Sequence, residues 1–203
     1  QPVEVTYRCF ELDPTKARDI KESIYESLAK KYGMSIDQAK ANTQNMVRMA
    51  NEAGLDFQMD TLIQTNTFDA HRLTMFAKTK GLMKEMTERL LFAYFTESKH
   101  IGDHETLTDM AVEVGLDREE VSHMLASDEM AEVVRADERT AQQIGITGVP
   151  FFLINKKYAL TGAQPTDVFI QALEKIAAED QIVVLNNQEG LNCDDDGCEI
   201  PKK

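Results

Sequence analysis

The sequence contains no tryptophan, only three cysteines and five prolines, and no long apolar run. Three cysteines are too few for the disulfide framework of a small secreted domain, and their odd number leaves at least one without an intramolecular partner. No stretch approaches the roughly 18 apolar residues of a membrane span, and the residues from Gln1 to Glu4 do not resemble a signal peptide. We therefore expect a cytoplasmic protein of a reducing compartment, or a redox protein with a dedicated cysteine pair.

Positive charge is also scarce, since 22 lysines and arginines stand against 35 acidic residues, which gives a formal net charge of -13. Such an excess of negative charge repels phosphate groups, so we expect neither nucleic acid nor a membrane surface as a partner. The 42% of hydrophobic and 28% of charged residues are typical of a globular protein. A chain of 203 residues is long enough for one domain or two small ones with a proper core.

Helical periodicity dominates the sequence after an alternating N-terminal segment. The alternation of apolar and polar residues from Val3 to Phe10 predicts a strand, with Cys9 as a small buried hydrophobe. Helix start and stop signals then predict helices from Asp13-Pro14 to Gly33, from Ser35 to Gly54, from Asn66 or Thr67 to about Lys80, from Leu82 to about Glu97, from Asp103 to Gly115, from Asp117 onward, and from Ser127 or Asp128 to Ile144.

A short stretch around Gly148-Val149-Pro150 connects the last of these helices to an apolar strand. Pro150 cannot donate to a sheet, so it belongs at the start of a strand, and a bond to proline is the only cheap place for a cis peptide. We expect strands from Phe151 to Ile154 and from Tyr158 to Thr161, followed by a helix that begins at Pro165. An ordinary helix-to-strand turn is the alternative interpretation of this stretch.

Several segments resemble one family. Ile146-Thr147-Gly148-Val149-Pro150-Phe151-Phe152 resembles the cis-proline loop of thioredoxin-fold proteins, and residues 155–164 are similar to the DsbA family, in particular to its FrnE-like branch. That branch is related to the 2-hydroxychromene-2-carboxylate isomerases. Residues 8–14 resemble its early strand, and residues 66–72 resemble the start of a helix in its helical insert. The resemblance covers nearly the whole chain and implies a mostly helical α/β protein, in which an all-helical insertion interrupts a thioredoxin-like fold.

The same resemblance implies a division of the chain into four parts. Residues 1–14 and 136–180 would form the thioredoxin-like part, with the early strand in the first segment and the cis-proline loop, hairpin and last helix in the second. Residues 15–135 would form the helical insertion, and residues 181–203 an acidic tail.

DsbA-like proteins react through a Cys-x-x-Cys motif at the N-terminus of a helix, where the helix dipole stabilises a thiolate. The sequence contains no such motif, and it matches the family from a point after it. Three explanations are open: a segment that precedes Gln1, a relative that has lost the motif, or chemistry moved to a cysteine pair in the tail. We expect the first, because a sheet without its central strand leaves backbone groups unpaired.

The resemblance implies a thiol-disulfide oxidoreductase that acts on protein or small-molecule disulfides without a cofactor. Thr147, Gly148, Val149 and Pro150 would position the substrate. Two alternatives are open: a glutathione-linked isomerase of the 2-hydroxychromene-2-carboxylate type, with glutathione as substrate or co-substrate, and a non-catalytic binding module. The expected partners are a disulfide-containing protein or peptide, or glutathione, and a homodimer is also left open.

Asn66, His71 and Arg72 are candidates for a groove between the helical and thioredoxin-like parts, because groove residues of the isomerase relatives occupy this position. The alternative for these residues is a helix cap and a satisfied helix face. His100 and His104 are separated by Gly102 and are not expected to bind a metal.

Cys193 and Cys198 form a Cys-x4-Cys pattern in the acidic tail. The acidic neighbours should raise the pKa of both thiols, which makes Cys193 a poor nucleophile. We interpret the two cysteines as a secondary redox pair, with an inert tail and a partial metal site as alternatives. Two cysteines without a nearby histidine fall short of a zinc site, so no metal is expected.

Overall fold

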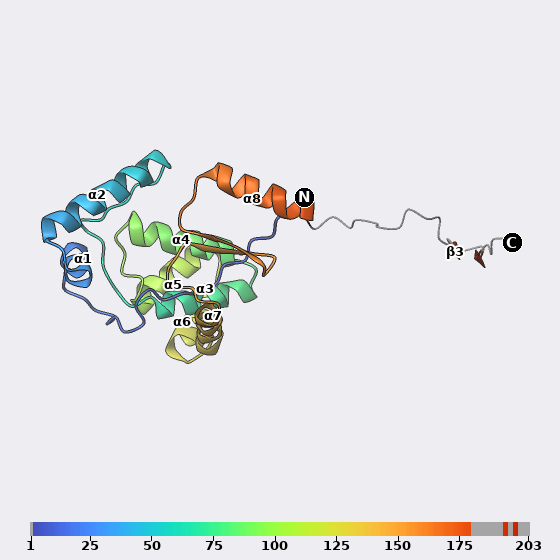
Figure 1. Ribbon diagram of the computed structural model, residues 1–203. Coiled ribbons are helices and arrows are strands. Elements are labelled where there is room, and N and C mark those ends of the chain that lie inside the picture. The colour runs from blue at the N-terminus through green and yellow to red at the C-terminus, as the bar shows by residue number, and fades with distance from the viewer. Residues whose placement is uncertain (1, 180–192, 195–196, 199–203) are drawn as a thin grey trace. The chain divides into compact units, whose positions relative to one another are not determined.

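The computed structural model describes residues 2–179, 193–194 and 197–198. Its contacts divide the chain into two units, residues 4–151 and residues 1–3 with 152–203, and each unit is described by itself. The first unit is helical (Figure 1), with α1 (Ile24–Tyr32), α2 (Ile36–Glu52), α3 (Phe68–Thr79), α4 (Met83–Phe95), α5 (His104–Glu113), α6 (Arg118–Ala126) and α7 (Ala131–Gln143). The boundaries predicted for the helical insertion, at residues 15 and 135, stay a prediction.

Side-chain caps fix the starts of several helices where the sequence predicted them. Ser35, Asp103 and Asp117 each accept a hydrogen bond from the backbone N–H three residues later. Ser35 also forms a full capping box with Gln38, whose side chain accepts from the Ser35 N–H. These bonds satisfy backbone donors that a helix N-terminus leaves without an intrahelical partner.

The predicted start of the first helix is wrong. The Asp13 side chain accepts hydrogen bonds from the N–H and hydroxyl of Thr15, and its carbonyl accepts from Lys16 N–H, so the segment closes a turn instead. Aspartate offers local bonds that compete with a helix. The helix α1 begins at Ile24, behind a capping box formed by Ser23 and Glu26.

The helix α7 also begins later than predicted, at Ala131 instead of at Ser127 or Asp128. Met130 lies in the left-handed region, with φ 62°, and Ala131 N–H donates to the Asp128 carbonyl. The chain therefore turns once more before α7 begins.

The strand predicted from Val3 to Phe10 is not formed: residues 2–10 run as coil. A strand needs a neighbour on which its backbone groups pair, and this segment pairs with no strand in the part of the chain that the structure describes. The prediction for Cys9 is confirmed, because its side chain is buried.

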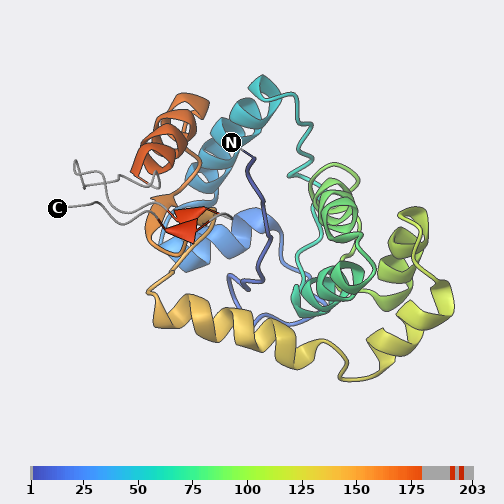
Figure 2. The ribbon, with the colours of Figure 1, turned by 90° about the vertical axis from the view of Figure 1, so that its right-hand side faces the viewer.

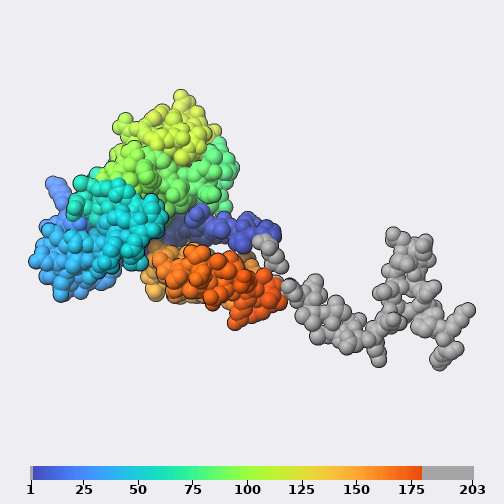
Figure 3. Space-filling view, turned by 90° about the horizontal axis from the view of Figure 1, so that it is seen from above, coloured from blue at the N-terminus to red at the C-terminus, as the bar shows by residue number. Residues whose placement is uncertain are grey.

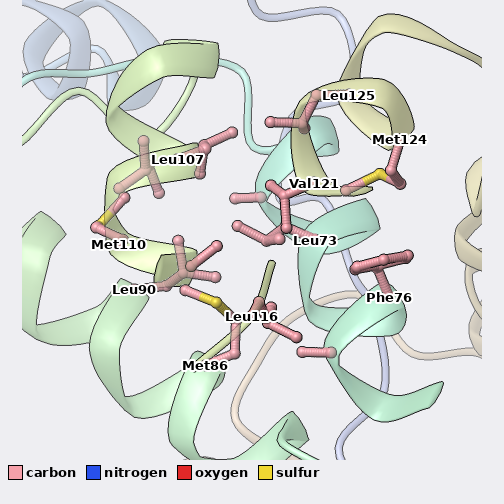
Figure 4. Close-up of a cluster of buried hydrophobic side chains, with 14 of the residues drawn as sticks. Leu73, Phe76, Met86, Leu90, Leu107, Met110, Leu116, Val121, Met124 and Leu125 are labelled. Atoms are coloured by element: carbon pink, nitrogen blue, oxygen red, sulfur yellow. The ribbon is translucent and has the colours of Figure 1, made fainter. Parts of the chain in front are cut away.

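The core of the helical unit lies among α3, α4, α5 and α6. Figure 4 shows Leu73 of α3, Met86 of α4, Leu107 of α5 and Val121 of α6 directed into one cluster, and all four are fully buried. Burial of each such side chain contributes about 1.5–3 kcal/mol. The helix α3 therefore packs against α4, α5 and α6.

The helices α1 and α2 pack on each other, and Figure 3 shows them in blue to cyan beside the green helices. A buried polar residue, Gln64, ties this part to the segment before α3. Its amide donates to the Glu22 carbonyl at 3.0 Å and to the Ser27 hydroxyl at 2.9 Å, while its oxygen accepts from Lys16 at 2.7 Å.

The second unit contains the strands β1 (Phe151–Ile154, whose first residue belongs to the helical unit) and β2 (Tyr158–Thr161), the helix α8 (Thr166–Glu179), and the short strands β3 (Cys193–Asp194) and β4 (Gly197–Cys198). Asn155 and Lys156 both have positive φ, 51° and 55°, as a tight hairpin turn requires. Phe152 meets Phe169 of α8 edge to face, with 4.7 Å between ring centroids.

Within the described ranges, no helix has the length and apolar character needed to cross a membrane.

Candidate functional site

The loop after α7 has the geometry that its sequence predicts. Gly145 lies in the left-handed region, with φ 77°, and ends the helix. The peptide bond between Val149 and Pro150 is cis, as predicted, and β1 follows directly. Val149 is 50% exposed, and a side chain at Gly148 would meet no atom within 4 Å. The loop therefore leaves open space beside its backbone, while the substrate-binding role of Thr147, Gly148, Val149 and Pro150 stays a prediction.

A pocket of about 410 Å³ lies in the helical unit, between the N-terminal segment and α7. Figure 2 shows this segment in dark blue and α7 in gold. Phe10, Glu11 and Pro14 line the pocket from the segment, and Arg135, Glu138, Arg139 and Gln142 line it from α7. Because α7 ends at Gln143 and the cis-proline loop follows, this pocket and the loop are carried by the same helix.

Two carboxylates share one guanidinium in the pocket. Arg135 Nη1 donates to Glu11 Oε2 and to Glu138 Oε2, both at 2.6 Å. The side chain of Glu11 is only 1% exposed. Burial raises the pKa of Glu11; its bond to Arg135 opposes this shift and the nearby Glu138 adds to it. One positive charge therefore faces two carboxylates, of which at least one is deeply buried.

The guanidinium of Arg135 is held on several sides. Its central carbon lies 4.0 Å from the ring centroid of Phe68, the first residue of α3, and its edge carries the two carboxylates. Such stacking orients a guanidinium and adds an electrostatic attraction to the ring face.

Cys9 lies behind this pocket and is not a nucleophile. Its backbone N–H donates to Asp137 Oδ2 at 3.0 Å, and its sulfur lies 3.9 Å from the His71 carbonyl. Burial raises the pKa of its thiol to about 12, and the negative charges of Asp137 and Glu138 contribute to the shift. Since the thiolate is the reactive form, Cys9 is inert at neutral pH.

His71 is neutral in this environment. Burial lowers the pKa of its ring, while Glu138, a hydrogen bond to the Phe10 backbone and Asp137 oppose the shift. The ring therefore supports the backbone of the pocket wall and brings no positive charge to it.

Arg72 lies at the connection between α6 and α7, away from the other two groove candidates, Asn66 and His71. Its side chain is buried, and it donates to the carbonyls of Met124, Ser127 and Glu129, and to Asp69 Oδ1 at 2.8 Å. These contacts hold the connection between α6 and α7. Arg72 does not line the pocket, so its contacts favour the satisfied-helix-face alternative.

The structure brings Asn66 and His71 to the back of the pocket: Asn66 Nδ2 donates to Glu11 Oε1 at 3.1 Å, and its Oδ1 caps α3 by accepting from Phe68 N–H. The sequence interpretation missed the acidic pair and Arg135. The spacing of Arg135 and Glu138, three residues apart on a helix, was a visible signal. Nothing in the sequence pattern joins them to Glu11, which lies 124 residues before Arg135.

The cysteines of the tail are described by their backbone alone. The strands β3 and β4 pair antiparallel, with Cys193 directly opposite Cys198. Among the described residues there is no group of three or more His, Cys, Asp or Glu side chains arranged to hold a metal ion.

Comparison with known proteins identifies the family. Residues 1–174 match the DSBA-like thioredoxin domain. The chain belongs to this family. The predicted fold is thereby confirmed as a DsbA-like thioredoxin fold, α/β and mostly helical.

Solved structures agree with this assignment. The probable DsbA oxidoreductase SCO1869 of Streptomyces coelicolor is 39% identical, with a TM-score of 0.84 over 98% of this chain and 85% of its own. A protein of Nitrosomonas europaea, named as a disulfide isomerase, shares the fold at 17% identity, with a TM-score of 0.60 over 71% of this chain and 76% of its own.

A curated relative, the uncharacterized protein YwbO of Bacillus subtilis, is 35% identical over 99 residues. The match covers 48% of this chain and 49% of that relative, so the chain spans about half the length of the curated protein that it matches.

Proposed function

We propose that the protein is a thiol-disulfide oxidoreductase that acts on disulfide-containing peptides or proteins. The observation that carries the proposal is the likeness to the DsbA oxidoreductase of Streptomyces coelicolor over 98% of the chain. The cis-proline loop supports it, because Val149 and Gly148 leave an open backbone edge on which an extended substrate has room to lie. The FrnE-like branch and a cytoplasmic location belong to the same proposal.

The reaction class is thiol-disulfide exchange. A thiolate of the enzyme attacks one sulfur of the substrate disulfide, a mixed disulfide forms, and the other substrate sulfur leaves as a thiolate. A second enzyme thiol then attacks the mixed disulfide and releases the reduced substrate. Cys9 takes neither role, because its thiol is buried and stays protonated at neutral pH.

The test is reduction of insulin by dithiothreitol, followed as turbidity, with the full protein that the gene encodes. We expect acceleration of the reaction, and the same acceleration in a Cys9→Ser variant. Absence of acceleration, and of any mixed disulfide with a disulfide peptide in mass spectrometry, would reject the proposal. Glutathione binding without thiol exchange would favour the isomerase alternative.

We also propose that Cys193 and Cys198 form a second redox pair. Residues directly opposite in an antiparallel ladder have their Cα atoms about 4.5–5.5 Å apart, which is within the range of roughly 4.4–6.8 Å that a disulfide spans. The register of β3 and β4 makes these two cysteines such opposite neighbours.

Thiol counting in denaturant tests this second proposal. For the 203-residue chain we expect one reactive thiol after mild oxidation and three after reduction, since three cysteines are present. The Cys193→Ser/Cys198→Ser double variant should give one thiol under both conditions. Three thiols in the oxidised wild-type chain would contradict the pairing.

A further inference from the structure

We propose that Glu11 and Glu138 share one proton, and that this proton makes the attachment of the N-terminal segment, residues 8–14, to α7 dependent on pH. With the proton in place, the segment is held on the helix. When the proton leaves to solvent as the pH rises, the attachment weakens. The inference goes beyond the proposed oxidoreductase activity and does not depend on it.

The contact between the two carboxyl groups requires a proton. Arg135 Nη1 donates to Glu11 Oε2 and to Glu138 Oε2, both at 2.6 Å, so one nitrogen brings the two groups together. The side chains of Glu11 and Glu138 also form a hydrogen bond with each other. Ionised carboxylates are acceptors only, so two of them cannot form such a bond. A single proton on the pair supplies the donor.

A buried oxygen of Glu138 identifies the acceptor of this proton. Glu138 Oε1 is buried, and no N–H or hydroxyl group among the described residues donates to it. The other oxygen of the same carboxylate accepts from Arg135. A buried acceptor without a donor is costly. A protonated Glu11 would satisfy this oxygen from within the chain.

The surroundings of Glu11 favour its neutral form. Its side chain is 1% exposed, and burial raises its pKa above the ordinary value of 4.5; the bond to Arg135 opposes this shift, and the hydrogen bond and charge of Glu138 add to it. One guanidinium balances the charge of one carboxylate, and the shared proton neutralises the other. The three groups then carry no net charge.

The other charged groups around the pair leave this balance unchanged. On α7, Asp137 is paired with Arg8 of the segment at 3.1 Å, and Arg139 is paired with Glu132. From α3, the ring of His71 is neutral, because burial lowers its pKa. This ring gains a proton only as the pH falls below its ordinary value of 6.5, so it does not contribute to a change at higher pH.

Side-chain contacts hold the segment to α7 (Figure 2), because the segment itself runs as coil. In the described part of the chain, no hydrogen bond between backbone groups joins it to a helix. Its contacts with α7 are those of Glu11 with Arg135 and of Arg8 with Asp137, and the Cys9 N–H donates to Asp137 Oδ2 at 3.0 Å. The Cys9 amide therefore reports whether the segment is attached.

The raised pKa of Glu11 sets the direction of the pH effect. A carboxyl group whose pKa is higher in the folded than in the unfolded state stabilises the folded state fully below the ordinary value, here 4.5. This contribution is lost as the pH rises through the folded pKa. Two ionised carboxylates then face one guanidinium, and Glu138 Oε1 loses its donor. Since the segment forms one wall of the pocket along α7, the pocket opens with it.

Hydrogen exchange of the Cys9 amide tests the inference in the full chain. The intrinsic rate of an unstructured peptide at the same pH, divided by the observed rate, gives a protection factor that measures opening of the segment. We expect this factor to fall several-fold in the wild type as the pH rises from 5 to 8.

Two variants remove the need for the proton. In Glu11→Gln the side-chain amide donates to Glu138 at every pH, and in Glu138→Gln the amide donates to Glu11. The protection factor of the Cys9 amide should no longer fall with pH in either variant. Glu132→Gln makes the same change at an 80% exposed position of α7 and should behave as the wild type. Circular dichroism checks folding, and one folded variant of the pair suffices.

A carbon-13 titration detects the proton itself. The side-chain carboxyl carbon of Glu11 should titrate above the ordinary 4.5 in the wild type. Its midpoint should move to lower pH in Glu138→Gln, because an amide donor there replaces the proton. The Glu132→Gln variant should leave the midpoint unchanged.

A Glu11 midpoint at or below 4.5 would overturn the inference. So would a protection factor of the Cys9 amide that falls equally in the wild type and in Glu11→Gln or Glu138→Gln. A raised midpoint with a protection factor that stays constant in the wild type would show a shared proton that does not hold the segment, and would reject the pH-dependent attachment.

Discussion

At the scale of single residues, Cys9 illustrates how burial controls reactivity. With a thiol pKa of about 12, only roughly one in 10⁴ molecules carries the thiolate at pH 8. We expect alkylation of Cys9 by iodoacetamide at pH 8 to be at least about a hundredfold slower in the folded protein than in urea. Peptide mass mapping measures this rate for each cysteine separately. Rapid labelling of Cys9 in the native state would show that its segment opens readily.

His71 makes stability depend on pH. Its folded pKa is lowered from the ordinary value of 6.5 by burial, so the unfolded state binds a proton more readily than the folded state. The resulting stability is present above pH 6.5 and is lost as the pH falls towards the folded pKa, by at most about 1.4 kcal/mol per pH unit.

Urea unfolding between pH 5 and pH 8 should therefore show a steeper loss towards acid pH in the wild type than in a His71→Gln variant. Glu11 acts in the opposite direction, because its raised pKa favours the folded state at low pH. It is present in both proteins, so the difference between the two curves isolates His71. Parallel curves would contradict the lowered pKa.

Arg72 provides a prediction about stability. Its replacement by methionine leaves Asp69 without its guanidinium and removes a donor from three backbone carbonyls, of which only that of Met124 keeps others, the N–H and hydroxyl of Ser127. Loss of one partner from a buried charged network typically costs about 3–5 kcal/mol. Urea unfolding should show this loss for Arg72→Met and only about 0–1 kcal/mol for Arg118→Met, whose ion pair with Asp109 is exposed.

The role of a residue could be predicted from the sequence where its partner is close along the chain. Ser35 and Asp117 cap helices through bonds that span three positions, and the helix starts at both were visible in the pattern. Glu11 finds Arg135 only because the fold brings the N-terminal segment against α7. Contacts of this range depend on tertiary structure, which no local pattern encodes.

At the scale of elements, Gly102 fixes the approach between the segment before α3 and the start of α5. A Cβ atom at this position would lie 2.1 Å from Thr65 Oγ1 and 3.2 Å from the Asn66 carbonyl oxygen. The Thr65 hydroxyl is engaged with the Arg18 carbonyl at 2.7 Å and cannot move without loss of that bond. We expect Gly102→Ala to lower the free energy of unfolding by about 1–3 kcal/mol.

Gly148→Ala is the matched control for stability, because a Cβ atom there meets nothing within 4 Å and the residue does not need positive φ. Thermal unfolding of both variants measures the comparison. Equal stability of the two variants would show that Thr65 can move away from the new Cβ atom without a loss of stability.

The elements themselves were predicted unevenly, for identifiable reasons. The helices α2 to α6 have apolar faces, α2, α5 and α6 also have side-chain caps, and the positions of all five agree with the prediction within a few residues. The prediction of a strand from Val3 to Phe10 was wrong. Alternation of apolar and polar residues indicates only that a segment can fit a sheet, whereas a strand forms only beside another strand with which its backbone pairs. Aspartate and proline at positions 13 and 14 were compatible with both a helix start and a turn, and local bonds to Thr15 decided for the turn.

At the scale of the whole molecule, the net charge of -13 should act on every charged substrate. An acidic protein attracts cationic disulfides and repels anionic ones over distances comparable to the Debye length.

For the thiol-disulfide exchange proposed above, we therefore predict opposite salt effects on the rates with two small disulfides. The rate with cystamine, a dication, should fall several-fold as salt rises from about 0.01 M to about 1 M, because the Debye length shrinks from roughly 30 Å to roughly 3 Å. The rate with oxidised glutathione, an anion, should rise over the same range. Bis(2-hydroxyethyl) disulfide is neutral and serves as the control with a constant rate. If cystamine followed the neutral control, the reacting sulfur would lie outside the acidic field.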